Sequence, residues 1–305
     1  MTISHQVRLS FATAVCATIV GVLGWIAASG GLCQAQSKTN ERLNLNDLPS
    51  IVSVPSVESG EPQPGKRVWW TVPGYEDWNV PVALYLPPQW SPKKTYPVIF
   101  EYPGNGGYRN ALGDSSEGTV DGCKLGYGWS LGQDTIWVSL PFVDSKTRKH
   151  SVRWWGDVEA TVQFCKAAVA AVGRSWSGDR ERMVLCGFSR GALACSYIGL
   201  YDDEIASQWR ALMPHSHYDG VRKWEYDSSD PAHAIERLRR FRDKPQFISH
   251  EVSIDATKKF LETNQLAHDR LVWCPIPFPN HSPDWLLKEL PESQQAREWL
   301  RKIME

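Results

Sequence analysis

Residues 183–193 read MVLCGFSRGAL, an apolar run that ends in the pattern Gly-x-Ser-x-Gly and continues into small residues. The apolar run predicts a buried strand, and the small residues after it predict the start of a helix. Gly187 and Gly191 carry no side chains that would collide across a sharp strand-to-helix turn. Because such a turn holds a serine in strained backbone geometry with its hydroxyl exposed, we expect Ser189 to be a nucleophile.

The chain on both sides of this turn alternates between apolar runs and amphipathic stretches. The apolar runs predict strands at residues 82–86, 97–102, 136–140, 183–186, 211–213, 246–249 and 271–275. Several of these runs are continuously apolar, which is typical of a parallel sheet covered on both faces. Apolar residues at helical spacing predict helices at residues 157–172, 190–201, 231–242, 256–265 and 292–303. This alternation favours an α/β domain.

The order of these features resembles the α/β-hydrolase superfamily. A strand is followed by the loop Pro-Gly-Asn-Gly-Gly, then by the Ser189 turn, and later by an acidic residue and a His. The resemblance covers residues 67–303 and implies a three-layer fold, with a mostly parallel central sheet of about eight strands and helices on both faces. Within the superfamily the chain is similar to bacterial secreted esterases, including acetyl-ester and polyester hydrolases. The elbow GFSRG at residues 187–191 also resembles the GxSRxG elbow of glucuronoyl esterases, where the Arg helps to bind the oxyanion.

The superfamily binds the oxyanion with two backbone donors. The first expected donor is the N–H of Arg190, directly after the nucleophile. The second should come from the loop PGNGGY at residues 103–108, whose glycines allow the backbone to approach a ligand closely. We expect the N–H of Asn105 or Gly106 to be this donor, and an ordinary tight turn is the competing interpretation.

The catalytic base is expected to be His281. It follows the last predicted strand and precedes the final predicted helix. The acid that fixes its tautomer should follow the strand at 246–249. Asp255 is the favoured acid, although it could instead cap the next helix, and Glu251 is the alternative because its longer side chain starts at the strand end. Asp219 is a third candidate.

Aromatic residues suggest how a substrate would be held. Trp154 and Trp155 open the helix before the elbow, where Trp155 could stack on a sugar ring or could simply pack in the core. Tyr108 and His217 are further candidates for substrate binding. Tyr108, Arg109 and Arg190 could contact an acidic or hydroxylated substrate. These residues favour a carbohydrate-linked ester.

Histidines alternate at His215 and His217, as in some metal sites, but no third ligand is evident in the sequence. We therefore expect both to line the cleft, and we expect neither a metal nor a cofactor. The 33 basic and 34 acidic residues nearly balance, which predicts no nucleic-acid partner. Cys123 and Cys165 are the expected disulfide pair if the protein reaches an oxidising compartment.

The N-terminus predicts export. Arg8 precedes an apolar stretch at residues 11–28, and small residues follow, so residues 1–35 are expected to be a signal peptide. An uncleaved anchor is the competing interpretation, and only then would the protein contact a membrane. We expect a secreted or periplasmic protein with a polar linker or loosely held arm at residues 36–66. Residues 67–305 would form the catalytic domain, with a small cap at residues 217–244.

Three functions follow from these features. The first is a serine esterase that cleaves a small-molecule or polysaccharide ester through an acyl-enzyme intermediate. The second is a serine peptidase of the same fold, similar to the catalytic domains of prolyl oligopeptidases. The third is a non-catalytic binding protein that kept the fold, an interpretation based on the irregular acid segment at residues 250–257.

Overall fold

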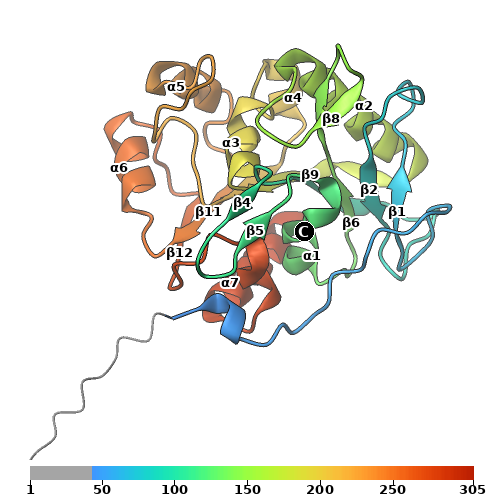
Figure 1. Ribbon diagram of the computed structural model, residues 1–305, viewed down its shortest axis with the longest axis horizontal. Helices are drawn as coiled ribbons and strands as arrows, with labels where there is room; N and C mark the ends of the chain where they lie inside the picture. Colours follow the sequence, from blue (N-terminus) through green and yellow to red (C-terminus); the bar gives the residue numbers. More distant parts are fainter. Residues whose placement is uncertain (1–42) are drawn as a thin grey trace, which may run out of the picture. The chain divides into compact units, whose positions relative to one another are not determined.

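The computed structural model describes residues 43–305. An eight-stranded sheet forms the centre of this part of the chain (Figure 1). The strands follow one another across the sheet in the order β1-β2-β6-β3-β9-β10-β11-β12. Every neighbouring pair from β6 to β12 is parallel, and only β1 and β2 run antiparallel to their neighbours. The strands span Arg67–Trp70 (β1), Val82–Tyr85 (β2), Tyr96–Tyr102 (β3), Ile136–Ser139 (β6), Gly178–Phe188 (β9), Ala211–His215 (β10), Gln246–Glu251 (β11) and Leu271–Ile276 (β12).

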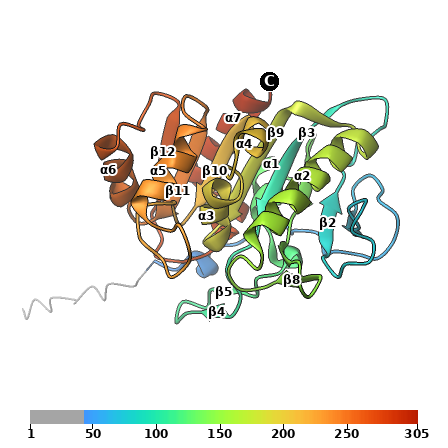
Figure 2. The same ribbon diagram turned by 90° about the horizontal axis from the view of Figure 1, so that it is seen from above.

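Helices cover both faces of this sheet (Figure 2). One hydrophobic core lies under α2 (Val158–Ser175), α3 (Arg190–Tyr197), α4 (Asp203–Ser207), α5 (Pro231–Arg239) and α6 (Asp255–Thr263). A second core lies under α1 (Leu125–Ser130) and α7 (Pro291–Met304). Along β3, Phe100 belongs to the first core and Ile99 to the second, because successive side chains of a strand point to opposite faces. The predicted three-layer architecture with a mostly parallel central sheet is confirmed.

The predicted helices are present with small shifts at their ends. Asp157 caps α2, since its carboxylate accepts a hydrogen bond from the backbone N–H of Ala160 (3.0 Å). The short helices α1 and α4 were not predicted, nor were the 3₁₀ turns η1 (Leu45–Asp47), η2 (Val120–Gly122) and η3 (Pro283–Leu287). One or two turns carry too little periodicity to be recognised. Among residues 43–305, no helix combines the length and the apolar character needed to cross a bilayer.

Two small hairpins were also not predicted. β4 (Tyr108–Arg109) pairs with β5 (Ser115–Ser116), and β7 (Phe142–Asp144) pairs with β8 (Lys149–Ser151). The first hairpin follows the carboxyl end of β3, and the second follows that of β6. Figure 2 shows β4, β5 and β8 along one side of the sheet. Loops at the carboxyl ends of parallel strands are where open α/β sheets bind ligands.

The described part of the predicted arm, residues 43–66, packs on the domain. Leu45 is 1% exposed and belongs to the second core. Isolated β-bridges join Ser50 to Lys288 and Glu58 to Val68. These contacts correct the expectation of a loosely held arm for residues 43–66. Polar composition alone did not reveal them, because the partners lie far away in the sequence.

The predicted disulfide is wrong. All five cysteines in residues 43–305 are free and buried. Cys123 lies in the second core and Cys165 in the first, so the sheet separates them. A disulfide requires Cα atoms within about 7 Å of each other and Cβ atoms that point toward each other, which two side chains packed in cores on opposite faces of the sheet do not provide.

Candidate active site

Ser189 lies in the turn between β9 and α3, with the unusual backbone angles φ 54° and ψ −114°. A Cβ on Gly187 would lie 2.2 Å from backbone atoms of Gly191, and a Cβ on Gly191 would lie 2.1 Å from the carbonyl oxygen of Tyr102. Both glycines are therefore required for the close approach. The Ser189 N–H donates to the carbonyl of His215 (3.0 Å), which ties the turn to β10. The strained elbow expected from the sequence is present.

Ser189, His281 and Glu251 form a continuous hydrogen-bonded line. His281 Nε2 lies 3.0 Å from Ser189 Oγ, and His281 Nδ1 lies 2.7 Å from Glu251 Oε1. His281 comes from the loop after β12, and Glu251 is the last residue of β11. With the Nδ1 proton directed at Glu251, Nε2 is free to accept the proton of the Ser189 hydroxyl.

Asp255 does not reach His281. Its carboxylate accepts a hydrogen bond from Ser253 Oγ (2.8 Å) in the first turn of α6. β11 continues to Glu251, two residues beyond the predicted strand end at 249, so Glu251 stands at the edge of the sheet beside the His. This placement corrects the expectation for Asp255 in favour of the alternative.

Asp219, the third candidate acid, is buried elsewhere. It accepts hydrogen bonds from Ser196 Oγ (2.8 Å) and from Arg237 Nε (2.9 Å). This ion pair ties the segment after β10 to α3 and α5.

Sequence analysis missed Ser216, the residue directly after β10. Its hydroxyl donates to Glu251 Oε1 (2.7 Å) and lies 2.7 Å from His281 Nδ1. Ser216 is fully buried and has a φ of 84°, a backbone conformation that is strained for a residue other than Gly. Ser216 could have been recognised as a candidate because it follows a predicted strand, and that strand comes next in sequence after the strand of the elbow.

The environment keeps Glu251 ionised. Burial alone would raise the pKa of its carboxyl, but the hydrogen bonds from His281 and Ser216, with nearby imidazoles, hold that pKa well below its usual range. A carboxylate at this position stabilises an imidazolium at His281.

The other histidines of the site are neutral at pH 7. Burial lowers the pKa of His215 to about 4, and burial likewise lowers the pKa of His217 to about 4. His215 lies between Ser249 Oγ (3.0 Å from Nδ1) and the carbonyl of Ser282 (3.0 Å from Nε2). Only a ring N–H can bond a carbonyl, so Nε2 donates to Ser282 and Nδ1 accepts from Ser249. His215 therefore supports the loop that carries His281. Within residues 43–305 no cluster of potential ligands could hold a metal ion.

The expected oxyanion donors are only partly in place. The N–H of Gly106 donates to the carbonyl of Val152 (2.7 Å), so it is already occupied, which corrects that prediction. Asn105 accepts the N–H of Trp154 with its side-chain oxygen (2.8 Å). Asn105 and Arg190, the first residue of α3, line the same cavity as Ser189. Because the first N–H groups of a helix have no partner within it, that of Arg190 can serve a ligand.

The Arg190 side chain binds backbone carbonyls. Its guanidinium donates to those of Gly104 (2.9 Å), Gly118 (3.3 Å), Ser151 (3.3 Å) and Trp154. Burial lowers the pKa of this guanidinium to about 9. The Arg190 side chain was expected to contact the substrate directly. It instead binds and supports the loops around the oxyanion site. Arg109 is exposed and pairs with Glu117 (2.8 Å).

A cavity of about 310 Å³ opens above Ser189. Its walls include Tyr108 and His217, as expected, together with Leu193 and Trp224. The ring of Tyr108 lies 4.8 Å from that of His281. His217 and Trp224 both come from the predicted cap segment at 217–244.

Trp154, and not Trp155, faces this cavity. Trp154 is 38% exposed, has a φ of 51° and contacts Trp224 (5.7 Å between ring centroids). Trp155 is 4% exposed and packs between Phe142 and Tyr197 in the core. The prediction that Trp155 lines the substrate cleft is therefore wrong, and its neighbour Trp154 lines the cavity.

Comparison with known proteins identifies the fold. No family model and no curated protein sequence matches this chain. The native structure of esterase 2 from Thermogutta terrifontis is similar at a TM-score of 0.54 and 17% identity, over 79% of this chain and 93% of that one. A Bacteroides ovatus protein named for dipeptidyl aminopeptidase IV is similar at a TM-score of 0.50 and 14% identity, over 73% of this chain and 33% of that one. A thermostable esterase, at a TM-score of 0.47, is matched over 62% of its length. With its elbow, sheet order and layers, the chain has the α/β-hydrolase fold.

Proposed function

We propose that this chain is a serine hydrolase that cleaves carboxylic esters through an acyl-enzyme intermediate on Ser189. The observation that carries the proposal is the hydrogen-bonded line from Glu251 through His281 to Ser189, at 2.7 Å and 3.0 Å. It combines a nucleophile, a base and a carboxylate in the geometry of a catalytic triad. Esterases of the same fold among solved structures are in keeping with this function.

The reaction follows from this geometry. His281 Nε2 takes the proton of Ser189 as its oxygen attacks the ester carbonyl, and Glu251 stabilises the resulting imidazolium. The backbone N–H groups of Arg190 and Asn105 bind the oxyanion, each worth roughly 3 kcal/mol of barrier. His281 then protonates the leaving alcohol, and water repeats the sequence to release the acid.

We further propose that the substrate ester is linked to a carbohydrate. Trp154 is 38% exposed and lines the cavity, and Trp224 lies beside it. Indole faces suit flat, weakly polar ring surfaces, such as the C–H face of a sugar. Neutral His217 and the hydroxyl of Tyr108 supply hydrogen-bonding groups in the same walls.

A serine peptidase is the second candidate, favoured by the likeness to the Bacteroides ovatus protein. The non-catalytic alternative depends on an irregular acid segment, and the hydrogen bond of Glu251 to His281 supports the catalytic proposal against it.

The experiment compares p-nitrophenyl acetate with a p-nitroanilide peptide as substrates. We expect turnover of the ester alone, its loss in Ser189→Ala, and normal turnover in the control Ser207→Ala, which changes an exposed serine of α4. Ester hydrolysis that survives Ser189→Ala would overturn the proposal, and cleavage of the anilide would favour the peptidase. An acetylated xylo-oligosaccharide tested against a simple alkyl acetate checks the carbohydrate preference.

Export is also a proposal, supported by the apolar stretch at residues 11–28 after Arg8. We expect mass spectrometry of the exported protein to show cleavage near residue 35. A full-length protein recovered from the membrane would support the anchor instead.

A further inference from the structure

His281 lies in an irregular loop between β12 and η3, and its backbone is held by one carboxylate. Oδ2 of Asp114 accepts hydrogen bonds from the N–H of His281 (2.9 Å) and from Asn110 Nδ2 (2.7 Å). Oδ1 of Asp114 accepts from Asn280 Nδ2 (2.8 Å) and Asn46 Nδ2 (3.2 Å). Asp114 is 4% exposed, so these four donors satisfy a buried carboxylate.

The same loop is held from the other side by residues 44–46. The N–H of Leu45 donates to Asn280 Oδ1 (2.7 Å), and Asn280 Nδ2 donates to Asn44 Oδ1 (2.9 Å). Asn46 Nδ2 also donates to the carbonyl of Leu112 (2.8 Å), in the turn between β4 and β5. Residues 44–46 thus join the hairpin that carries Asp114 to the loop that carries His281, although about 235 residues of chain separate them from that loop.

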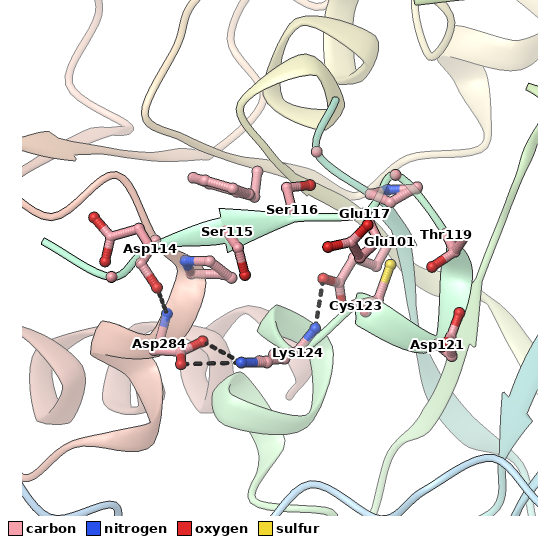
Figure 3. Close-up of a pocket in the computed structure, with 18 of the residues that line it drawn as sticks. Glu101, Asp114, Ser115, Ser116, Glu117, Thr119, Asp121, Cys123, Lys124 and Asp284 are labelled. Carbon is pink, nitrogen blue, oxygen red and sulfur yellow. Dashed lines mark hydrogen bonds and ion pairs between the residues drawn. The ribbon is translucent and has the colours of Figure 1, made fainter. Parts of the chain in front are cut away.

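Asp114 lines a second cavity, of about 250 Å³, which Phe188 also lines. Figure 3 shows Asp114 at one end of this cavity and Asp121 at the other. The cavity contains several carboxylates, but among the described residues only Asp114 accepts a hydrogen bond from the backbone of His281.

We infer that Asp114, together with residues 44–46, is a positioning element for His281. It keeps the imidazole within reach of Ser189 by fixing the backbone of residues 280 and 281 from both sides. This inference rests on the proposed function. A displacement of about 1 Å at a catalytic group lowers turnover by roughly 100-fold, so loss of these contacts should act on the chemical step.

The test uses the full chain and two sets of variants. Both oxygens of Asp114 accept hydrogen bonds from N–H groups. In Asp114→Asn the amide N–H₂ would therefore face N–H donors in either orientation of the amide. We expect kcat to fall by about 10- to 100-fold with KM unchanged. Asp121→Asn is the matched control from the other end of the cavity and should behave as wild type. The double variant Asn44→Ala/Asn46→Ala should lower kcat in the same way, and Asp47→Ala, an exposed residue of η1, should not.

Each kcat is divided by the number of serines titrated with a fluorophosphonate. A merely structural role would reduce the number of active molecules and leave the turnover per titrated serine intact. Unchanged turnover per serine in the double variant and in Asp114→Asn would overturn the inference. If the inference fails in this way but Ser189→Ala still abolishes ester hydrolysis, the proposed function is supported and only the positioning role is lost. If Asp114→Asn does not fold, the surface variant Asn44→Ala/Asn46→Ala decides.

Discussion

Replacing Glu251 by Gln isolates the charge of the triad acid. Glu251 Oε1 accepts from both His281 Nδ1 and Ser216 Oγ, each at 2.7 Å, whereas Oε2 lies 3.1 Å from His250 Nδ1. Because two donors point at the position of Oε1, the Gln side chain of the variant should place its amide oxygen there. Its N–H₂ group then takes the position of Oε2 and faces His250. The variant should therefore keep the tautomer of His281 and lose only the negative charge.

The size of the effect follows from the kind of hydrogen bond that is lost. Hydrogen bonds to charged groups contribute about 1.5–3 kcal/mol, against about 0.5–1.5 kcal/mol for neutral pairs. A loss of about 1–2 kcal/mol as the imidazolium forms corresponds to a kcat reduced about 5- to 30-fold. Glu251→Ala removes the acceptor altogether, so control of the tautomer is lost and kcat should fall by about 10⁴-fold.

The assay is steady-state hydrolysis of p-nitrophenyl acetate at pH 7.5, with thermal unfolding as a check on folding. Asp255→Asn is the matched control, because Asp255 is exposed in the first turn of α6 and bonds only to Ser253. We expect its kcat to stay within about twofold of wild type, since a first-turn carboxylate contributes only about 0.3–1 kcal/mol to its helix. The reasoning is refuted if Glu251→Gln is as active as wild type, or if Asp255→Asn loses more activity than Glu251→Gln does.

Three further predictions follow from the site. Ser216→Ala removes one donor to Glu251 and should lower kcat by about 5- to 10-fold with KM unchanged; a changed KM alone would contradict the positioning role. Trp154→Ala should raise KM for an acetylated sugar with little change in the unfolding midpoint, whereas Trp155→Ala should cost about 3–5 kcal/mol in denaturant unfolding; equal destabilisation by the two would refute the assignment. Burial lowers the pKa of His215 from 6.5 to about 4, so the unfolded chain binds more protons and stability falls as the pH drops from 6.5 towards 4. His215 should contribute about 3 kcal/mol of that loss, beside the similar contribution of His217, so His215→Gln should show a shallower pH dependence than wild type in urea unfolding between pH 7 and pH 4; an equal slope would refute it.

Most of the layered fold was predictable from local patterns. Every predicted strand is present, because the continuous apolar runs of a sheet buried on both faces are visible in the sequence. The helices α2 and α7 were equally clear, since each repeats apolar residues over several turns. The hairpins β4–β5 and β7–β8 were not predicted, because strands of two or three residues carry almost no periodicity.

Within the site, the elbow was predictable and the acid was not. The glycines at 187 and 191 reveal the turn because neither position has room for a Cβ; a Cβ on Gly187 would meet Gly191 within the turn, whereas one on Gly191 would meet Tyr102 at the end of β3. Asp255 and Glu251 differ by only four positions, and the choice between them depends on where β11 ends against β12. Trp154 and Trp155 differ in where their side chains lie. Trp154 has a positive φ of 51°, and the local sequence did not predict this backbone conformation.

By itself, the sequence determined the order of the longer strands and helices and the identity of the residue in the elbow, since both leave a local pattern of apolar periodicity and glycine spacing. Only the tertiary structure decided which carboxylate meets His281, which indole lines the cavity and which segment holds the histidine loop. Those choices depend on contacts between residues that are dozens to hundreds of positions apart, such as Leu45 with Asn280 and Ser216 with Glu251. Hydrogen bonds of this kind depend on distance and direction in space, and neither quantity is encoded in local composition.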